Sequence, residues 1–295
     1  MPKSLVYLRC KRSPEQLIKA KKSLGQNFLT DHRVAQRIVD AANPLRTDIV
    51  IEIGPGTGAL TRLLVERSSV VEAIELDERL AVVLRRAVPA TNLEIRVADA
   101  LTIDWSDLIS SARNKLEVPD RDKSRVRVIA NLPYYISTPI LEKLLSLRRS
   151  VFDMTLMLQK EVADRITEGP GGKEYGALSV IVQYQCVASK LFDVGPSAFT
   201  PAPKVHSAVV HLTVREQPPV EVRDEAQFFS VVRAAFAQRR KTILNNLKAA
   251  AAVSKFVRPL EEALEAASVS PQRRAETLTV GEFALLTKAL CDQTA

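Results

Sequence analysis

Short apolar runs alternate with helix-like patterns along residues 49–160. Residues 49–53, 70–74, 92–97, 125–130 and 151–158 are rich in β-branched and aliphatic side chains, which predicts strands. The segment 59–67 and the stretch that follows Asp77 have the spacing of amphipathic helices. Strands that alternate with helices predict an α/β fold with a doubly wound, mostly parallel sheet. Two later runs, 190–194 and 205–214, are expected to pair antiparallel at one edge.

Capping and turn residues set the expected limits of further elements. Thr30 or Asp31 is expected to cap a helix that ends before Pro44. Residues 106–124 are charged and rich in turn formers, and we predict a surface loop there with at most one helical turn. Other helices are expected from Ser137, over 160–167 and over 176–188.

The composition changes after Gln217-Pro218-Pro219. The remaining chain is alanine-rich and has helical spacing over about 225–236, 239–252, 258–268 and 281–291. We therefore predict three parts. These are a basic N-terminal extension (1–24), a catalytic domain (25–215) and a small all-helical C-terminal domain (216–295).

A glycine-rich turn, Gly54-Pro55-Gly56-Thr57-Gly58, directly follows the first predicted strand. Glycines allow a tight turn and a close approach of the backbone to a ligand, which is expected beside the N-terminus of the next helix. The spacing Gly54-x-Gly56-x-x-Ala59 also fits a permissive dinucleotide fingerprint. The turn by itself therefore leaves a nicotinamide or flavin oxidoreductase open.

Two carboxylates stand at the ends of the next two predicted strands. Glu75 lies 21 residues after Gly54 and is placed to accept the hydroxyls of a ribose. Asp99 is placed to accept from the exocyclic amine of a bound adenine. Each also has a structural interpretation, as a charge near a helix N-terminus or a loop carboxylate. Asp77 fits the first of these structural roles better.

The fourth predicted strand ends in Asn131-Leu132-Pro133-Tyr134. The Asn131 amide oxygen and the Leu132 carbonyl form a pair of acceptors that suits the two N–H groups of an exocyclic amine. Pro133 stiffens the turn and Tyr134 can stack on a base. Acceptors without a strong base suit methylation of a planar amine, whereas hydride transfer needs none of them. A tight turn with a packed tyrosine is the structural alternative.

The charge balance favours an anionic partner, since the net charge is +8 and the sequence pI is about 9.5. The basic residues of 1–24 fit either a solvated tail or an arm that follows a phosphate backbone. The three cysteines and three histidines lack metal-ligand spacing, and no apolar run reaches the length of a membrane span. We expect a reduced, cytoplasmic protein without a metal or a membrane partner.

Five ordered motifs resemble the rRNA adenine N6-dimethyltransferases, most closely the bacterial small-subunit (KsgA/RsmA) type. The resemblance runs from about residue 21 to the C-terminus. It implies a Rossmann-like, S-adenosyl-L-methionine-dependent methyltransferase that dimethylates two adjacent adenosines in a hairpin near the 3′ end of small-subunit rRNA, on the assembling subunit. The motifs are Gly25-Gln26-Asn27-Phe28-Leu29, Glu52–Gly58, Asn131–Tyr134, Phe199–Val205 and Arg239–Leu247.

The resemblance also implies roles for single residues. The target amine would meet Asn131, Leu132, Pro133 and Tyr134, with Phe199 as a second aromatic near the base. Cofactor contacts would come from Asn27, Leu29, Gly54, Gly56, Glu75, Asp99 and Asn131. RNA contacts are expected from Arg239, Arg240 and Lys241, although basic side chains on a helix face are often merely solvated. We expect a monomer.

Three alternatives stay open at this stage. The first is the large-subunit adenine methyltransferase of the antibiotic-resistance type, against which Leu132 and the 239–247 motif argue. The second is a non-catalytic RNA-binding assembly or transcription factor on the same fold, which the intact Asn131 and Glu75 disfavour. The third is the oxidoreductase indicated by the glycine turn.

Overall fold

The computed structural model describes residues 21, 25–116, 124–251, 256 and 258–291. Contacts divide the chain into two compact units. The first is Met1–Lys143, Thr155–Met157 and Val194–His206, and the second is Leu144–Met154, Leu158–Asp193 and Ser207–Ala295. Of the predicted basic extension only Lys21 belongs to the described residues. The predicted domain limits at 24 and 215 stay predictions.

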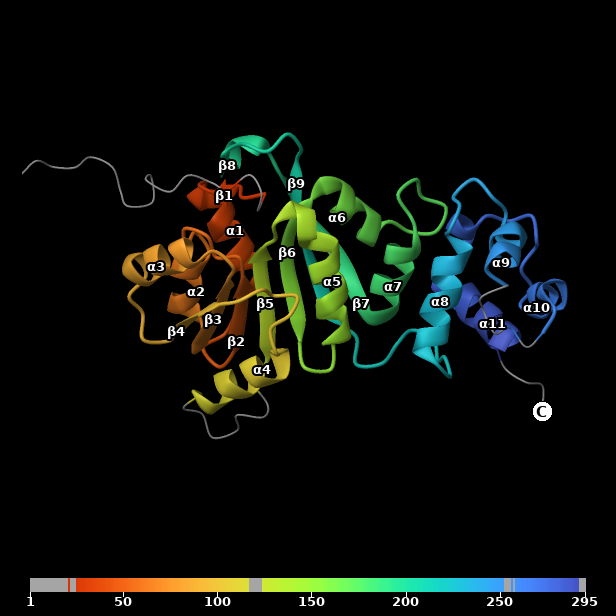
Figure 1. The fold of residues 1–295 in the computed structure, drawn as a ribbon, viewed down its shortest axis with the longest axis horizontal. Coiled ribbons are helices and arrows are strands. Elements are labelled where there is room, and N and C mark those ends of the chain that lie inside the picture. Colours follow the sequence, from red (N-terminus) through yellow and green to blue (C-terminus); the bar gives the residue numbers. More distant parts are fainter. Residues whose placement is uncertain (1–20, 22–24, 117–123, 252–255, 257, 292–295) are drawn as a thin grey trace, which may run out of the picture. The chain divides into compact units, whose positions relative to one another are not determined.

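Seven strands form one sheet in the order β4-β3-β2-β5-β6-β9-β7. In the first unit, β2 (Ile49–Ile53) pairs in parallel with β3 (Val70–Glu75) and β5 (Val126–Asn131), and β3 pairs in parallel with β4 (Leu93–Val97). Figure 1 shows these four strands side by side. The predicted doubly wound, mostly parallel sheet is confirmed.

The register of the strands brings their carboxyl ends to one edge. Ile53 lies beside Ile74 on one side and Ala130 on the other, and Glu75 lies beside Val97. The residues that directly follow these strands therefore lie at the same edge of the sheet, which is where open α/β sheets bind their ligands.

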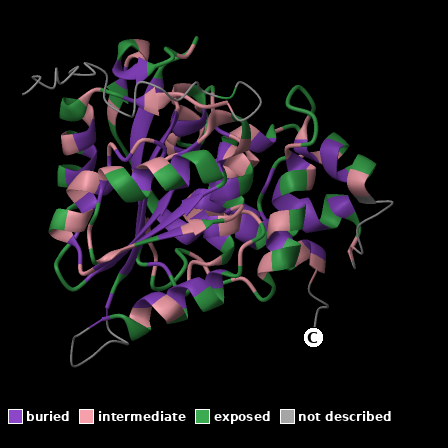
Figure 2. Cartoon of the chain, turned by 60° about the vertical axis from the view of Figure 1, so that its left-hand side comes forward, coloured by how far each residue is buried: buried purple, intermediate pink, exposed green. Residues whose placement is uncertain are grey.

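The strands β2 and β3 are buried along their whole length, which accounts for their mostly apolar sequences. Figure 2 shows buried strands beneath helices that are buried on one side only. The helices of this unit include α1 (His32–Ala42), α2 (Thr61–Arg67) and α3 (Glu78–Ala87). Asp31 caps α1 by accepting from Arg33 N and Val34 N, and the left-handed Asn43 ends it, as predicted.

The predicted loop at 106–124 is wrong for the part that the structure describes. Helix α4 (Trp105–Asn114) occupies it, and residues 117–123 lie outside the described residues. Asp104 accepts from Ser106 N and Asp107 N and so caps the helix. The buried side chains have helical spacing and begin with Trp105, one residue before the predicted loop; they are Trp105, Leu108, Ile109 and Ala112.

A two-stranded sheet joins segments that are far apart in sequence. β1 (Phe28–Leu29) pairs antiparallel with β8 (Phe199–Thr200), so that Leu29 lies beside Phe199. Thr30 N also donates to the Ala198 carbonyl at 2.8 Å. This pairing could not be predicted from the sequence, because strands of two residues have no measurable periodicity.

The second unit holds a strand pair and the C-terminal helices. Its elements are α6 (Lys160–Thr167), α7 (Ala177–Gln185), β7 (Cys186–Val194), β9 (Ser207–Val214), α8 (Glu225–Ala235), α9 (Ile243–Ala251), α10 (Leu260–Ala266) and α11 (Val280–Cys291); β6 (Asp153–Gln159) belongs to both units. Several predicted helices are shorter than expected, including the one over 258–268, which is α10 (Leu260–Ala266) in the structure. The segment 186–188 belongs to β7 instead of α7, and α9 begins at Ile243 instead of 239.

Candidate functional site

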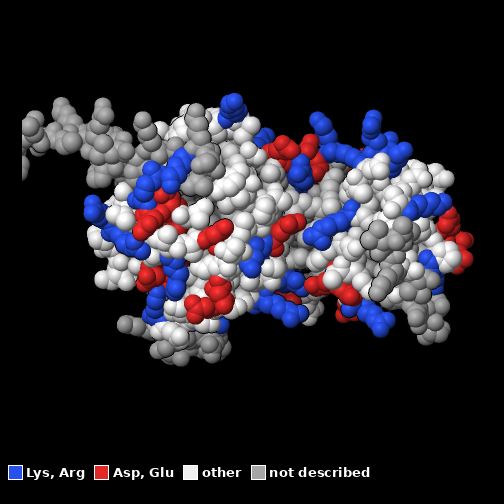
Figure 3. Space-filling view, viewed as in Figure 1, with Lys and Arg blue, Asp and Glu red and all other residues white. Residues whose placement is uncertain are grey.

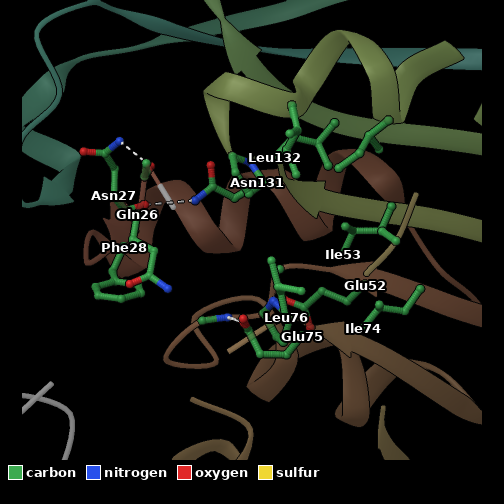
Figure 4. A pocket seen from close by; sticks show the side chains of 18 of the residues that line it. Gln26, Asn27, Phe28, Glu52, Ile53, Ile74, Glu75, Leu76, Asn131 and Leu132 are labelled. Carbon is green, nitrogen blue, oxygen red and sulfur yellow. Dashed lines mark hydrogen bonds between the residues drawn. The ribbon is translucent and has the colours of Figure 1, made fainter. Parts of the chain in front are cut away.

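A pocket opens at the shared edge of the parallel strands in the first unit. Its empty volume, which includes open solvent, is about 920 Å³. The residues come from β1, from the glycine turn and from the ends of β3, β4 and β5 (Figure 4). Ten predicted site residues line it: Asn27, Leu29, Gly54, Gly56, Glu75, Asp99, Asn131, Leu132, Pro133 and Tyr134.

The glycine turn needs glycine for its backbone conformation. Gly54 and Gly56 have φ values of +66° and +56°, which side-chain-bearing residues rarely adopt. A Cβ atom on Gly56 would also lie 3.1 Å from Cδ1 of Phe28. The turn and the segment that carries Phe28 therefore pack closely against each other at the pocket.

Glu75 is a buried carboxylate held by two backbone donors. Its Oε2 accepts from Gly56 N at 3.1 Å and its Oε1 from Asp77 N at 2.9 Å. Burial raises the pKa of Glu75, and these hydrogen bonds oppose that rise. Each carboxylate oxygen has a second lone pair. The side chain can therefore accept ligand hydroxyls without losing its anchors.

Glu52 is a second buried carboxylate at the pocket, and it was not predicted as a site residue. Its Oε2 accepts from the Thr61 hydroxyl at 2.7 Å. Burial raises the pKa of Glu52 to about 8. The sequence signal was an acidic residue inside an otherwise apolar strand.

The Glu52→Gln variant is expected to flatten the pH dependence of stability. The pKa of Glu52 rises from 4.5 to about 8 on folding, so the folded state binds this proton more tightly. The free energy of unfolding of the wild type should therefore fall as the pH rises from about 4.5 to about 8. Glutamine removes this titration, and urea unfolding at pH 5 to 8.5 measures the difference.

The Glu52→Gln variant should keep part of the pH dependence of its free energy of unfolding, because Glu75 is still present and its raised pKa acts in the same direction. Equal slopes for the variant and the wild type would show that Glu52 is ionised throughout this pH range.

One part of the pocket wall combines acidic side chains with apolar surface. Asp99 lies just beyond the end of β4, and its Oδ1 accepts from Leu101 N at 2.9 Å. Leu76 lines the pocket between Glu75 and Asp77 and is 47% exposed. Sequence reasoning missed Leu76, although an apolar residue between two acids at a strand end is an observable signal.

Asn131 at the end of β5 is held by the segment that precedes α1. Its Nδ2 donates to the Asn27 carbonyl at 3.4 Å, and Asn27 Nδ2 donates to the Gly25 carbonyl at 3.1 Å (Figure 4). Because a carbonyl oxygen can only accept a hydrogen bond, the nitrogen of the Asn131 amide has to face the Asn27 carbonyl. The amide oxygen is then the atom that remains for a ligand.

Two tyrosines of the 3₁₀ turn η4 (Tyr134–Ile136) line the pocket. The Tyr134 carbonyl accepts from Ser137 Oγ at 3.1 Å, which ties the turn to the following helix α5 (Ser137–Ser146). Tyr135 is 50% exposed, and its Cδ1 would lie 3.0 Å from a Cβ on Gly25. Only Tyr134 was predicted, although Tyr135 stands next to it in the motif.

Four predicted residues do not line this pocket. Phe199 is 3% exposed in β8, beside Leu29. Arg239, Arg240 and Lys241 belong to the second unit, where they are exposed in the turn before α9. Arg239 Nε lies 3.3 Å from Glu276 Oε2. The roles implied for these four residues stay predictions.

The described part of the chain offers neither a cluster of metal ligands nor a membrane-spanning helix. No group of three or more His, Cys, Asp or Glu side chains among the described residues could hold a metal ion. None of the helices within the described ranges is long and apolar enough to cross a membrane.

A parallel doubly wound sheet with a glycine turn, a buried carboxylate and an amide at one edge is typical of α/β proteins that bind a nucleoside cofactor. The family model described as ribosomal RNA adenine dimethylase matches residues 17–290. The ribosomal RNA small subunit methyltransferase A of Geobacillus sp. (strain WCH70) is 47% identical over 272 residues, which cover 92% of this chain and 91% of that protein. The chain belongs to the ribosomal RNA adenine dimethylase family.

Two solved structures agree with this assignment. A dimethyladenosine transferase from Plasmodium falciparum is 27% identical with a TM-score of 0.71, covering 88% of this chain and 95% of that one. The 23S rRNA methyltransferase ErmE is also 27% identical, with a TM-score of 0.66 and coverage of 90% and 99%. The predicted methyltransferase fold with a helical C-terminal part is confirmed.

Proposed function

We propose that this protein uses S-adenosyl-L-methionine to dimethylate N6 of two adjacent adenosines in a hairpin loop near the 3′ end of 16S rRNA. The reaction takes place on the assembling small subunit, in the cytoplasm. The observation that carries the proposal is the position of Asn131, whose amide lies in the same pocket as Glu75 and Asp99.

The residues present fit the adenosine part of this cofactor. Glu75 offers acceptors for ribose hydroxyls, Asp99 an acceptor for an adenine amine, and Leu76 an apolar surface for the purine. The glycine turn lets the backbone approach closely, and Asn27 and Leu29 complete the wall of the pocket. When bound, the cofactor supplies an electrophilic methyl group.

The chain's own part in the chemistry is to orient the target amine. The Asn131 amide oxygen and the Leu132 carbonyl accept its two N–H groups and draw the nitrogen toward tetrahedral geometry. The nitrogen lone pair is then available for in-line attack on the methyl group that the cofactor would supply. A monomethylated amine keeps one N–H, so the second methylation relies on a single acceptor. Tyr134 stacks on the base and limits its rotation.

The target base has to leave its stack to reach this pocket. Bases in loops are turned out at low cost and are recognised by aromatic stacking. The net charge of +8 supports binding to the phosphate backbone. On the face shown in Figure 3, Lys and Arg are interspersed with Asp and Glu, so the excess charge does not form a continuous stripe there. Arg239, Arg240 and Lys241 are the basic residues that we assign to RNA contact.

The large-subunit alternative has less support. The identity to a small-subunit methyltransferase A is 47%, whereas the identity to the 23S rRNA enzyme is 27%. The Leu132 position and the 239–247 motif favour the small-subunit type as well.

A methyl-transfer assay tests the proposal. Small subunits that lack these methylations are incubated with the protein and S-adenosyl-L-methionine labelled in its methyl group. We expect the label in N6,N6-dimethyladenosine of 16S rRNA and none in naked 23S rRNA. Label in 23S rRNA alone would favour the resistance-type activity, and unlabelled RNA of both kinds would contradict the proposal. Calorimetry with a nicotinamide cofactor, for which no binding is expected, tests the oxidoreductase reading.

A further inference from the structure

Asp77 is a buried carboxylate that does more than cap a helix. It begins α3, where its Oδ1 accepts from Arg79 N at 3.2 Å and from Arg79 Nε at 3.0 Å. Its Oδ2 lies 2.6 Å from Arg79 Nη2, and its side chain is 2% exposed. A helix cap needs only an oxygen acceptor, which asparagine provides as well as aspartate. The cap alone therefore does not account for the negative charge, which pairs with Arg79 and with a second set of partners.

The second set of Asp77 contacts comes from residues near the start of the described chain. Lys21 Nζ lies 3.2 Å from Asp77 Oδ2, and Gln26 Nε2 donates to the same oxygen at 3.5 Å. Gln26 Oε1 in turn accepts from Lys21 N at 2.7 Å. Hydrogen bonds from Arg79 foremost, and from Lys21 and Gln26, lower the pKa of Asp77 well below its usual range. The carboxylate is thus an ionised anchor for Lys21 and Gln26.

Gln26 belongs to the segment Gly25–Leu29, which forms one wall of the pocket. Within it, the Asn27 carbonyl holds the Asn131 amide, and Phe28 packs on Gly56. Leu29 is fixed from the other side by pairing with Phe199. The contacts of Asp77 therefore secure the end of the segment that the β1–β8 pairing does not reach.

We propose that Asp77 is a positioning residue for the cofactor. Its charge holds the segment Gly25–Leu29 closed over the pocket through Lys21 and Gln26, so that the wall is formed before the cofactor binds. The inference rests on the proposed function, since it takes the pocket to be the S-adenosyl-L-methionine site. Without this charge, only a fraction of the molecules has the segment Gly25–Leu29 in its closed position before the cofactor binds. The apparent affinity for the cofactor is then reduced in proportion to that fraction.

The test compares Asp77→Asn with Asp104→Asn in the full-length protein. Both substitutions keep a helix-capping residue, and Asp104, which caps α4, does not line the pocket. Calorimetry with S-adenosyl-L-methionine measures the dissociation constant. We expect about a tenfold increase for Asp77→Asn and no change for Asp104→Asn. Turnover at saturating cofactor should stay close to that of the wild type, because Asp77 does not contact the reacting groups.

Two further measurements separate positioning from general destabilisation. Lys21→Met replaces a partner whose side chain is 43% exposed, so we expect it to change the free energy of unfolding only slightly. It should weaken affinity in the same direction, and the double variant should bind no more weakly than Asp77→Asn. Without cofactor, hydrogen exchange of the peptide covering 25–31 should be faster in Asp77→Asn than in Asp104→Asn.

The outcomes distinguish this inference from the proposed function. Unchanged affinity and unchanged exchange in Asp77→Asn, beside a wild type that binds the cofactor, would overturn the positioning role alone. Additive effects of the Asp77 and Lys21 substitutions would also overturn it. A wild type that does not bind S-adenosyl-L-methionine would remove the proposed function and this inference together.

Discussion

Asn131→Ala is expected to lower the rate of methyl transfer by about 10²–10³-fold, the range seen when one aligned polar group that stabilises a transition state is removed. The substitution removes the amide oxygen that we assign to the target amine. It also removes the donor to the Asn27 carbonyl, a contact of 3.4 Å. Single-turnover methyl transfer at saturating cofactor measures the chemical step, and calorimetry measures cofactor affinity, which should change much less.

Asn92→Ala is the matched control for this variant. Asn92 Nδ2 donates to the carbonyls of Val65 and Ser68, both at 2.9 Å, so the side chain is also held by backbone but does not line the pocket. We expect this variant to lose stability and keep its rate per folded molecule. A normal single-turnover rate for Asn131→Ala would remove the catalytic assignment, even if its cofactor affinity fell.

The strand-end residues of the site were predictable from the sequence for a geometric reason. Parallel strands of a doubly wound sheet end at one edge, so Gly54, Glu75, Asp99 and Asn131 had to meet once their strands were recognised. The structure brings these four residues to one pocket. Neither their distances nor their hydrogen-bond partners follow from that rule, and their roles toward a ligand stay proposals.

The parts that sequence reasoning missed depend on contacts between distant or very short segments. The β1–β8 pairing joins strands of two residues each, which leave no pattern. The role of Asp77 beyond a helix cap depends on Lys21 and Gln26, more than 50 residues earlier in the chain. Helix α4 differs for another reason: its cap and its first buried residue, Asp104 and Trp105, lie just before the charged stretch for which the sequence predicts a loop.

Glu75→Gln is expected to weaken binding of S-adenosyl-L-methionine by about 100-fold, because hydrogen bonds to a charged group contribute about 1.5–3 kcal/mol. Glutamine keeps the size of the side chain but places an NH₂ group against either Gly56 N or Asp77 N, both of which donate to the carboxylate. It also offers fewer acceptors to a ribose. Turnover at saturating cofactor should be largely kept, since Asn131 is untouched. Calorimetry gives the affinity and steady-state kinetics the split between KM and kcat.

Two comparisons decide whether the loss of cofactor affinity in Glu75→Gln comes from a lost contact with the ribose. A cofactor analogue that lacks the 2′-hydroxyl should bind the wild type more weakly but lose little further affinity in Glu75→Gln, because the interaction is already absent. Glu72→Gln is the matched control: Glu72 is a buried carboxylate of the same strand that pairs with Arg96 and Lys115 and does not line the pocket. It should lower stability and leave affinity unchanged. Equal losses of affinity in the two variants would mean that Glu75 acts through the stability of β3 and not through a contact with the ligand.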